Sequence, residues 1–298
     1  MVTVRKRAAP DSGADAATSV QTLAVLLQAG AVPLVAWRYL ADTGDVHAAA
    51  VVARVENGTP LLAAIEEEGG AWLDLAASWE IATTVGAPLA EVLRMIAGTL
   101  RDAASAADDV RIALAEPAGT ARLLLWMPFA GLLLGFALGF DTIGVIFGNP
   151  IGSACVVAGL LLVFAARLWT TRLLDRARPA PGTPGMQAEL VAVALAGGAS
   201  VERALRLVAE SPASRNGTEE RVRTVLELSR AAGVPAGELL RAAAAQDRHA
   251  ARIDGRLRAA KLSTRLLIPL GVCTLPAFLL LGVAPLLLSV LASTPLPM

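Results

Sequence analysis

The chain has 298 residues, of which 55% are hydrophobic and 17% are charged, and its formal net charge at pH 7 is zero. This balance favours a membrane protein, and it excludes a nucleic-acid binder that works through an overall basic field or through aromatic base-stacking platforms. Cys155 and Cys273 each lie in an uncharged run, so the sequence contains neither a disulfide framework nor a CxxC motif.

The N-terminal segment is basic at first and then small and polar, without the apolar region of a signal peptide. We therefore predict a disordered tail over 1–19. The next stretch, Ala16–Trp37, carries no charge, but Gln21, Gln28 and a break between Gly30 and Pro33 interrupt it.

A second copy of this stretch decides how it is interpreted. Ala24–Ala41 aligns with Ala192–Ala209 without a gap, and the second copy carries Glu202 and Arg203. Charged residues are rare inside membrane helices. Both copies are therefore predicted to be soluble helix hairpins.

A second repeat follows at a different, shorter offset. TVGAPLAEVLR (84–94) returns as AAGVPAGELLR (231–241). Five pairs of residues match, one of which is Glu91 with Glu238. The repeat signature consists of the other four pairs, Gly86, Pro88, Leu93 and Arg94 in the first copy and Gly233, Pro235, Leu240 and Arg241 in the second. Each glycine is predicted to end a helix and each proline to begin the next one. The sequence distance between the copies is shorter for this repeat than for the hairpin repeat, so the first copy contains additional residues between its two repeats. About one extra helix is therefore expected in the first copy, within Asp42–Trp72.

Three long uncharged runs predict membrane spans. The first run lies between Arg122 and Asp141, the second lies between Asp141 and Arg167, and the third follows Arg265. A bilayer requires roughly 20 apolar residues per helix, which places the spans near 123–140, 150–168 and 266–291. Pro269, Pro276 and Pro285 predict that the third span is bent or locally unwound.

Arginine and lysine residues predict the orientation of these spans. These basic residues precede the first span, follow the second span and precede the third span. The loop after the first span and the C-terminal tail contain no arginine or lysine. Basic flanks are cytoplasmic, so the N-terminus and both polar regions are expected inside and the C-terminus outside. The predicted fold is all-α, with a tail at 1–19, a helical domain at 20–121, a transmembrane hairpin at 122–169, a second helical domain at 170–262, and a third transmembrane helix with a short external tail at 263–298.

No catalytic, cofactor-binding or metal-binding constellation is predicted. The two histidines, His47 and His249, have no second ligand at metal-binding spacing and are interpreted as solvated helix residues, and there is no phosphate-binding loop motif. The run Glu66–Glu68 is interpreted as a solvated helix end, with a metal site or a site for a basic partner as the alternative. Enzymatic activity is not expected.

Two further features are candidates for interactions. Gly131, Gly135 and Gly139 place three small residues on one face of the first span, which favours close packing, within the hairpin or between copies of the chain. A juxtamembrane basic stretch precedes the third span and consists of Arg252, Arg256, Arg258, Lys261 and Arg265. One interpretation is that this stretch fixes the membrane topology and contacts anionic lipid. The alternative is that it binds an acidic face of a cytoplasmic motor protein.

The sequence resembles the type II secretion system protein F family, the inner-membrane platform proteins of type II secretion systems, type IV pili and tight-adherence pili. The residues that carry the resemblance are 26–41 and 79–101 in the first copy and 195–209 and 231–244 in the second, and Phe140–Trp169 looks like the membrane hairpin of the tight-adherence branch. Members of that branch usually hold one such unit, so this chain would be a fused pair.

The resemblance implies a non-enzymatic platform in the cytoplasmic (inner) membrane, without a cofactor. Its implied partners are a cytoplasmic secretion ATPase, pilin-like subunits in the membrane, and further copies of the chain or a platform paralogue. The alternatives are a small transporter component, for which Asp141 would be the ionisable residue near the membrane, and a generic membrane adaptor.

Overall fold

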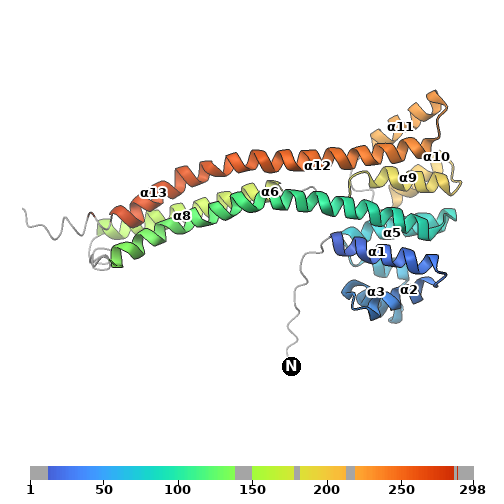
Figure 1. The fold of residues 1–298 in the computed structure, drawn as a ribbon, viewed down its shortest axis with the longest axis horizontal. Coiled ribbons are helices and arrows are strands. Elements are labelled where there is room, and N and C mark those ends of the chain that lie inside the picture. Colours follow the sequence, from blue (N-terminus) through green and yellow to red (C-terminus); the bar gives the residue numbers. More distant parts are fainter. Residues whose placement is uncertain (1–12, 138–149, 178–181, 213–218, 285–286, 288–298) are drawn as a thin grey trace, which may run out of the picture. The chain divides into compact units, whose positions relative to one another are not determined.

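The computed structural model describes residues 13–137, 150–177, 182–212, 219–284 and 287, and these residues form helices without any strand (Figure 1). The all-α prediction is therefore confirmed for the described part of the chain. The glycines with positive φ lie mostly in the breaks between successive helices or at their caps, which explains why short helices alternate with tight turns.

Six helices form the first part of the chain. They are α1 (Gly13–Gln28), α2 (Pro33–Asp42), α3 (Val46–Glu56), α4 (Leu61–Glu66), α5 (Ala71–Val85) and α6 (Leu89–Ala137). The tail predicted over 1–19 is too long, because α1 already begins at Gly13 and Ala16 and Ala17 are fully buried in it. Their small side chains allow the start of α1 to pack closely into a core.

The remaining helices are α8 (Pro150–Ala177), α9 (Met186–Ala196), α10 (Val201–Glu210), α11 (Glu219–Ala232), α12 (Ala236–Pro269) and α13 (Leu275–Phe278), with two π-helical segments, η2 (Leu270–Thr274) and η3 (Leu279–Val283), on either side of α13. The two predicted hairpins are present as α1 with α2 and α9 with α10. Gly30 and Gly198 turn them with φ of 91° and 85°.

The helix ends repeat at the offsets that the sequence contains. The first and last residues of α2 align with the first and last residues of α10 at the offset of the hairpin repeat. At the offset of the signature repeat, the end of α5 aligns with the end of α11, and the start of α6 aligns with the start of α12. Where one extra helix was expected between α2 and α5, the structure has two, α3 and the short α4.

The chain divides into two compact units, 1–108 with 180–253 (unit 1) and 109–179 with 254–298 (unit 2). This division differs from the two separate helical domains predicted over 20–121 and 170–262, because segments from both copies share a single hydrophobic core in unit 1. Helix α9 explains the difference: nearly all of its residues are buried and it has no polar face, as expected of a helix enclosed on all sides.

The core of unit 1 contains large side chains from both copies. Fully buried residues include Trp37, Trp72, Leu23, Ile65, Leu75, Ile81, Leu93, Ile96, Leu100, Leu190 and Leu240. Burial of each such side chain stabilises the fold by roughly 1.5–3 kcal/mol. Helix α5 packs against α9 within this core, and Val85 of α5 lies directly against Gly197, leaving no room there for a side chain.

In unit 2, helix α8 packs along η2, α13 and η3 (Figure 1). The π-helical segments follow Pro269 and Pro276, which lack the N–H that an α-helical hydrogen bond needs. The predicted local unwinding of the third apolar segment is thus present at these two prolines, whereas Pro285 lies outside the described residues.

Candidate functional site

The repeat signature forms two matching helix junctions. Gly86 (φ 73°) ends α5, the Ala87 N–H donates to the Ala82 carbonyl at 2.9 Å, and the Pro88 carbonyl accepts from Glu91 at 3.0 Å at the start of α6. In the second copy Gly233 (φ 66°) ends α11, and the Pro235 carbonyl accepts from Leu239 at 3.4 Å. The glycines and prolines of the signature therefore serve turn geometry.

The other signature residues divide between core and surface. Leu93 and Leu240 are both fully buried in the core of unit 1. Arg94 is exposed and donates to Gln28, and Arg241 donates to Glu238 at 2.8 Å. The two arginines are the charged residues of the signature, and both are exposed.

A buried carboxyl joins the two copies within unit 1, and sequence reasoning did not identify it. Asp74 of α5 accepts a hydrogen bond from the Thr183 hydroxyl at 2.5 Å, and both residues are buried. Burial raises the pKa of the Asp74 carboxyl from its ordinary value of 3.8 to about 6, and the hydrogen bond from Thr183 acts in the opposite direction. The two positions are so far apart in sequence that no local signal indicates this pair.

Arg248 of α12 makes a second polar contact in unit 1. Its Nη1 donates to Glu189 Oε1 of α9 at 3.0 Å, and its Nε lies 3.6 Å from Asp102 Oδ2 of α6. The Glu189 side chain is only 4% exposed, and its Oε2 is buried without a hydrogen-bond partner. Arg248 thus neutralises a carboxylate that the core of unit 1 would otherwise hold as an isolated charge.

His47 and Glu68 are not the solvated residues that the sequence predicts. His47 Nδ1 and Glu68 Oε2 are 2.5 Å apart, Arg54 Nη1 donates to Glu68 Oε1 at 2.5 Å, and the Glu68 side chain is 9% exposed. The His47 ring also packs on Trp72, with 5.3 Å between ring centroids. His47 lies in the first turn of α3, Arg54 in its last turn, and Glu68 just after the end of α4, so the cluster connects α3 to the segment between α4 and α5. Glu67, in contrast, is exposed, with an ion pair of 3.0 Å to Arg54.

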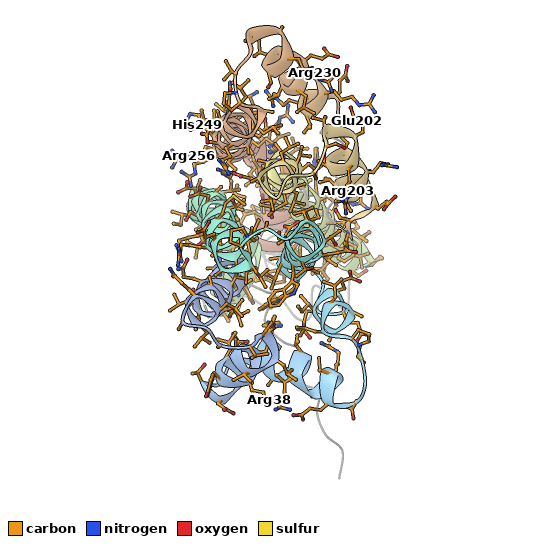
Figure 2. The ribbon with its side chains drawn as sticks, turned by 90° about the vertical axis from the view of Figure 1, so that its right-hand side faces the viewer. Arg38, Glu202, Arg203, Arg230, His249 and Arg256 are labelled. Carbon is orange, nitrogen blue, oxygen red and sulfur yellow. The ribbon has the colours of Figure 1, made fainter. Side chains whose placement is uncertain are left out.

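The described residues contain no group of three or more His, Cys, Asp or Glu side chains that could hold a metal ion. His249 is exposed on α12, and Figure 2 labels it together with several arginines and Glu202. Among these, Arg230 of α11 and Glu202 of α10 lie 3.7 Å apart with both side chains exposed. Arg38 of α2 and Glu56 of α3 form a similar exposed pair at 3.2 Å.

Gly131 of the first apolar segment and Gly159 of the second both pack against the third segment. A Cβ at Gly131 would lie 2.9 Å from Phe278 Cε2 and 3.5 Å from the Gly282 Cα, and a Cβ at Gly159 of α8 would lie 2.6 Å from Leu281 Cγ. The sequence predicts that the glycines of the first segment pack within the hairpin or against another copy of the chain. The contacts instead place Gly131 and Gly159 against α13 and η3. Gly135 lies in α6, but the structure does not describe what surrounds it, and Gly139 lies outside the described residues.

The juxtamembrane basic stretch is not uniform in its contacts. Arg252 donates to the Asp102 carbonyl at 3.4 Å, Arg256 pairs with Asp109 at 2.8 Å, and Arg258 donates to the Asp254 carbonyl of its own helix at 3.2 Å. Lys261 and Arg265 are exposed on the same helix. The stretch therefore combines residues that hold helices together with residues that are accessible.

One helix of the described chain, within Pro150–Leu173, is long and apolar enough to cross a membrane. It corresponds to the second predicted span, and it ends close to the basic residues that follow that span. The structure also has a shorter apolar helix at Gly271–Val283, inside the third predicted span, while the first predicted span extends from α6 into residues outside the description.

Comparison with known proteins gives one family match. Residues 19–137 match the family model described as type II secretion system (T2SS), protein F, a segment that runs from α1 to the end of α6. A search of curated proteins finds no match. The match at 19–137 supports the resemblance to the type II secretion system protein F family that the sequence indicates.

Proposed function

We propose that this protein is a non-enzymatic platform in the cytoplasmic (inner) membrane of a type II secretion or pilus-assembly machine. In this role it couples a cytoplasmic secretion ATPase to pilin-like subunits in the membrane. The observation that carries the proposal is the protein F family match at 19–137, which begins in the core of unit 1 and continues through α6 into its apolar C-terminal part.

The surface of unit 2 supports its insertion into a bilayer. Large apolar side chains are exposed on all three of its apolar segments, among them Leu123, Trp126 and Leu133 on α6, Leu161 and Phe164 on α8, and Val272 and Leu275 on η2 and α13. Water would disfavour so extensive an apolar surface, and lipid chains would cover it. Three spans with a cytoplasmic N-terminus and an external C-terminus remain the topology that we propose.

The repeated helix ends support a duplicated cytoplasmic unit. Hairpins whose second helices match end for end, and helix junctions that recur at a constant offset, are expected if one ancestral unit was copied. The shared core of unit 1 then acts as a single body that an ATPase could displace. We further propose that the chain belongs to the tight-adherence branch as a fused pair, and that it works as an oligomer with itself or with a platform paralogue.

In-cell photo-crosslinking tests this proposal. A photoreactive residue replaces Arg94 or Arg241 on unit 1, and Leu133 or Phe164 on unit 2, all of which are exposed. The probes on one unit serve as controls for those on the other. We expect the unit 1 probes alone to capture an ATPase and the unit 2 probes alone to capture a pilin-like helix. Capture of lipid or unrelated proteins from both sets would contradict the platform role and favour an adaptor or transporter.

Point probes are better suited to this test than removal of the first helical region. Residues from both copies share the core of unit 1, so deletion of one copy would expose the apolar faces of α5 and α9. Loss of ATPase capture after such a deletion would report unfolding as readily as a missing contact surface.

A further inference from the structure

Six basic side chains of unit 2 are exposed and make neither an ion pair nor a hydrogen bond within the described part of the chain. They are Arg111, Arg122, Arg167, Arg172, Lys261 and Arg265, which we call the cationic collar. Arg256 of the same unit differs from them because it pairs with Asp109 at 2.8 Å. The charge of the collar is therefore available to a ligand outside the protein.

Packing contacts bring four of the six collar residues, from three helices, to the same level of unit 2. Leu262 and Leu266 of α12 are buried together against Leu114 of α6 and Leu173 of α8. Arg172 and Lys261 are next to two of these leucines in sequence, Arg265 precedes the third, and Arg111 lies one helical turn before the fourth. Four of the six cations therefore surround one small core, although they come from helices far apart in sequence.

Exposed apolar side chains lie beyond this level on each helix, and Arg122 and Arg167 stand between the level and these side chains on α6 and α8. Leu123 follows Arg122 on α6 and is 73% exposed, and Ile268 lies one helical turn after Arg265 and is 53% exposed. On α8, which runs in the opposite direction, Phe164 lies one turn before Arg167 and is 66% exposed. Trp126 and Trp169 are also exposed near this boundary, as aromatic residues of a membrane interface are.

The geometry points to anionic phospholipid headgroups as the ligand of the cationic collar. A lipid presents its phosphate directly beside its acyl chains, which matches a ring of unpaired cations next to exposed apolar side chains. An acidic protein face would match the charge but would not cover the adjacent apolar surface. Arginine forms paired hydrogen bonds with phosphate oxygens, and long basic side chains can extend along the helix towards the headgroups. This inference rests on the proposed function only through the placement of unit 2 in a bilayer.

The test is lipid selectivity of the full chain reconstituted in bilayer vesicles. Spin-labelled phosphatidylglycerol and phosphatidylcholine report by electron paramagnetic resonance how strongly each lipid associates with the protein. We expect a preference for phosphatidylglycerol of roughly fivefold at low salt, the ratio expected for one cation near an anionic surface. The preference should decline between about 0.1 M and 1 M salt, where the Debye length falls from roughly 10 Å to 3 Å.

Matched variants identify the residues responsible. The triple variant Arg172→Gln, Lys261→Gln, Arg265→Gln should lose most of the preference. The triple variant Arg101→Gln, Arg203→Gln, Arg206→Gln removes the same charge from exposed positions of unit 1 and should leave the preference unchanged. Arg172→Lys with Arg265→Lys retains the charge and should retain most of the preference, which distinguishes a headgroup contact from a change in packing.

Three results would overturn the inference. These are equal association of both lipids with the wild-type chain, an unchanged preference in the collar variant, and capture of an acidic protein by a probe at Lys261 in place of lipid. Each of them would leave ATPase capture from unit 1 unaffected. A wild-type chain that does not enter bilayers at all would instead contradict the proposed platform function.

Discussion

Asp74 occupies a position where its charge is costly. The carboxyl is buried in unit 1, and its pKa of about 6 exceeds the value of 3.8 expected in the unfolded chain. Between these two pH values the unfolded chain binds fewer protons than the folded chain, so the free energy of unfolding falls as pH rises. The contribution of Asp74 to stability is complete below about pH 4 and is lost as the pH passes through 6.

Asp74→Asn should remove this pH dependence. The amide cannot ionise, and its oxygen can still accept from Thr183, so we expect the variant to be more stable than the wild type above pH 6, by roughly 1–3 kcal/mol. Thermal unfolding of the detergent-solubilised chain between pH 4 and pH 8 measures the difference. Thr183→Val is the control, since loss of the donor should raise the pKa of Asp74 further and extend the decline to higher pH. Equal pH slopes in wild type and Asp74→Asn would contradict this account.

Arg248 should be needed because it neutralises Glu189 in the core of unit 1. Arg248→Met leaves a buried carboxylate without its partner, and we expect destabilisation by roughly 3 kcal/mol. The double variant with Glu189→Gln should recover much of this loss. Arg241→Met removes an arginine that pairs with the exposed Glu238 and should cost no more than about 1 kcal/mol. Chemical denaturation monitored by circular dichroism distinguishes these outcomes, and additive losses in the double variant would argue against the pairing.

At the scale of helices, the local sequence predicts where a helix begins and ends, but it does not predict which other helix it packs against. Gly86 and Pro88 indicate a helix junction through their own backbone preferences, and the structure has that junction. Helix α9 is apolar except for Gln187 and Glu189, so no periodic stripe indicates that it packs against α5. The contact of Asp74 with Thr183 and the burial of Glu189 depend on that packing, which explains why sequence reasoning found neither residue.

The backbone of Gly86 gives the next prediction. An alanine at φ 73° is strained, so Gly86→Ala should destabilise unit 1 by about 1–2 kcal/mol. Gly98 lies inside α6 with open space around its Cα, so Gly98→Ala should stabilise the helix by roughly 0.5–1 kcal/mol. Opposite shifts in melting temperature for the same substitution would verify the turn geometry, and a stabilising Gly86→Ala would refute it.

For the whole molecule, the shared core makes the two copies mutually dependent. Each copy alone would expose the apolar residues through which α5 and α9 pack, and such surfaces favour aggregation or degradation. The chain order, with both apolar hairpin segments between the copies, therefore links assembly of unit 1 to synthesis of the complete chain. A chain cut between Pro179 and Ala180 should still assemble, provided that both pieces are present.

Co-expression of residues 1–179 and 180–298 as separate chains tests this dependence. We expect the two pieces to copurify and each piece alone to accumulate poorly. Gly197→Val should reduce copurification several-fold because any side chain at this position collides with Val85 of the other piece. Gly237→Val is the matched control, since nothing lies within 4 Å of a Cβ there. Stable accumulation of either piece alone would mean that the copies fold independently, and equal effects of the two valines would place the contact between copies elsewhere.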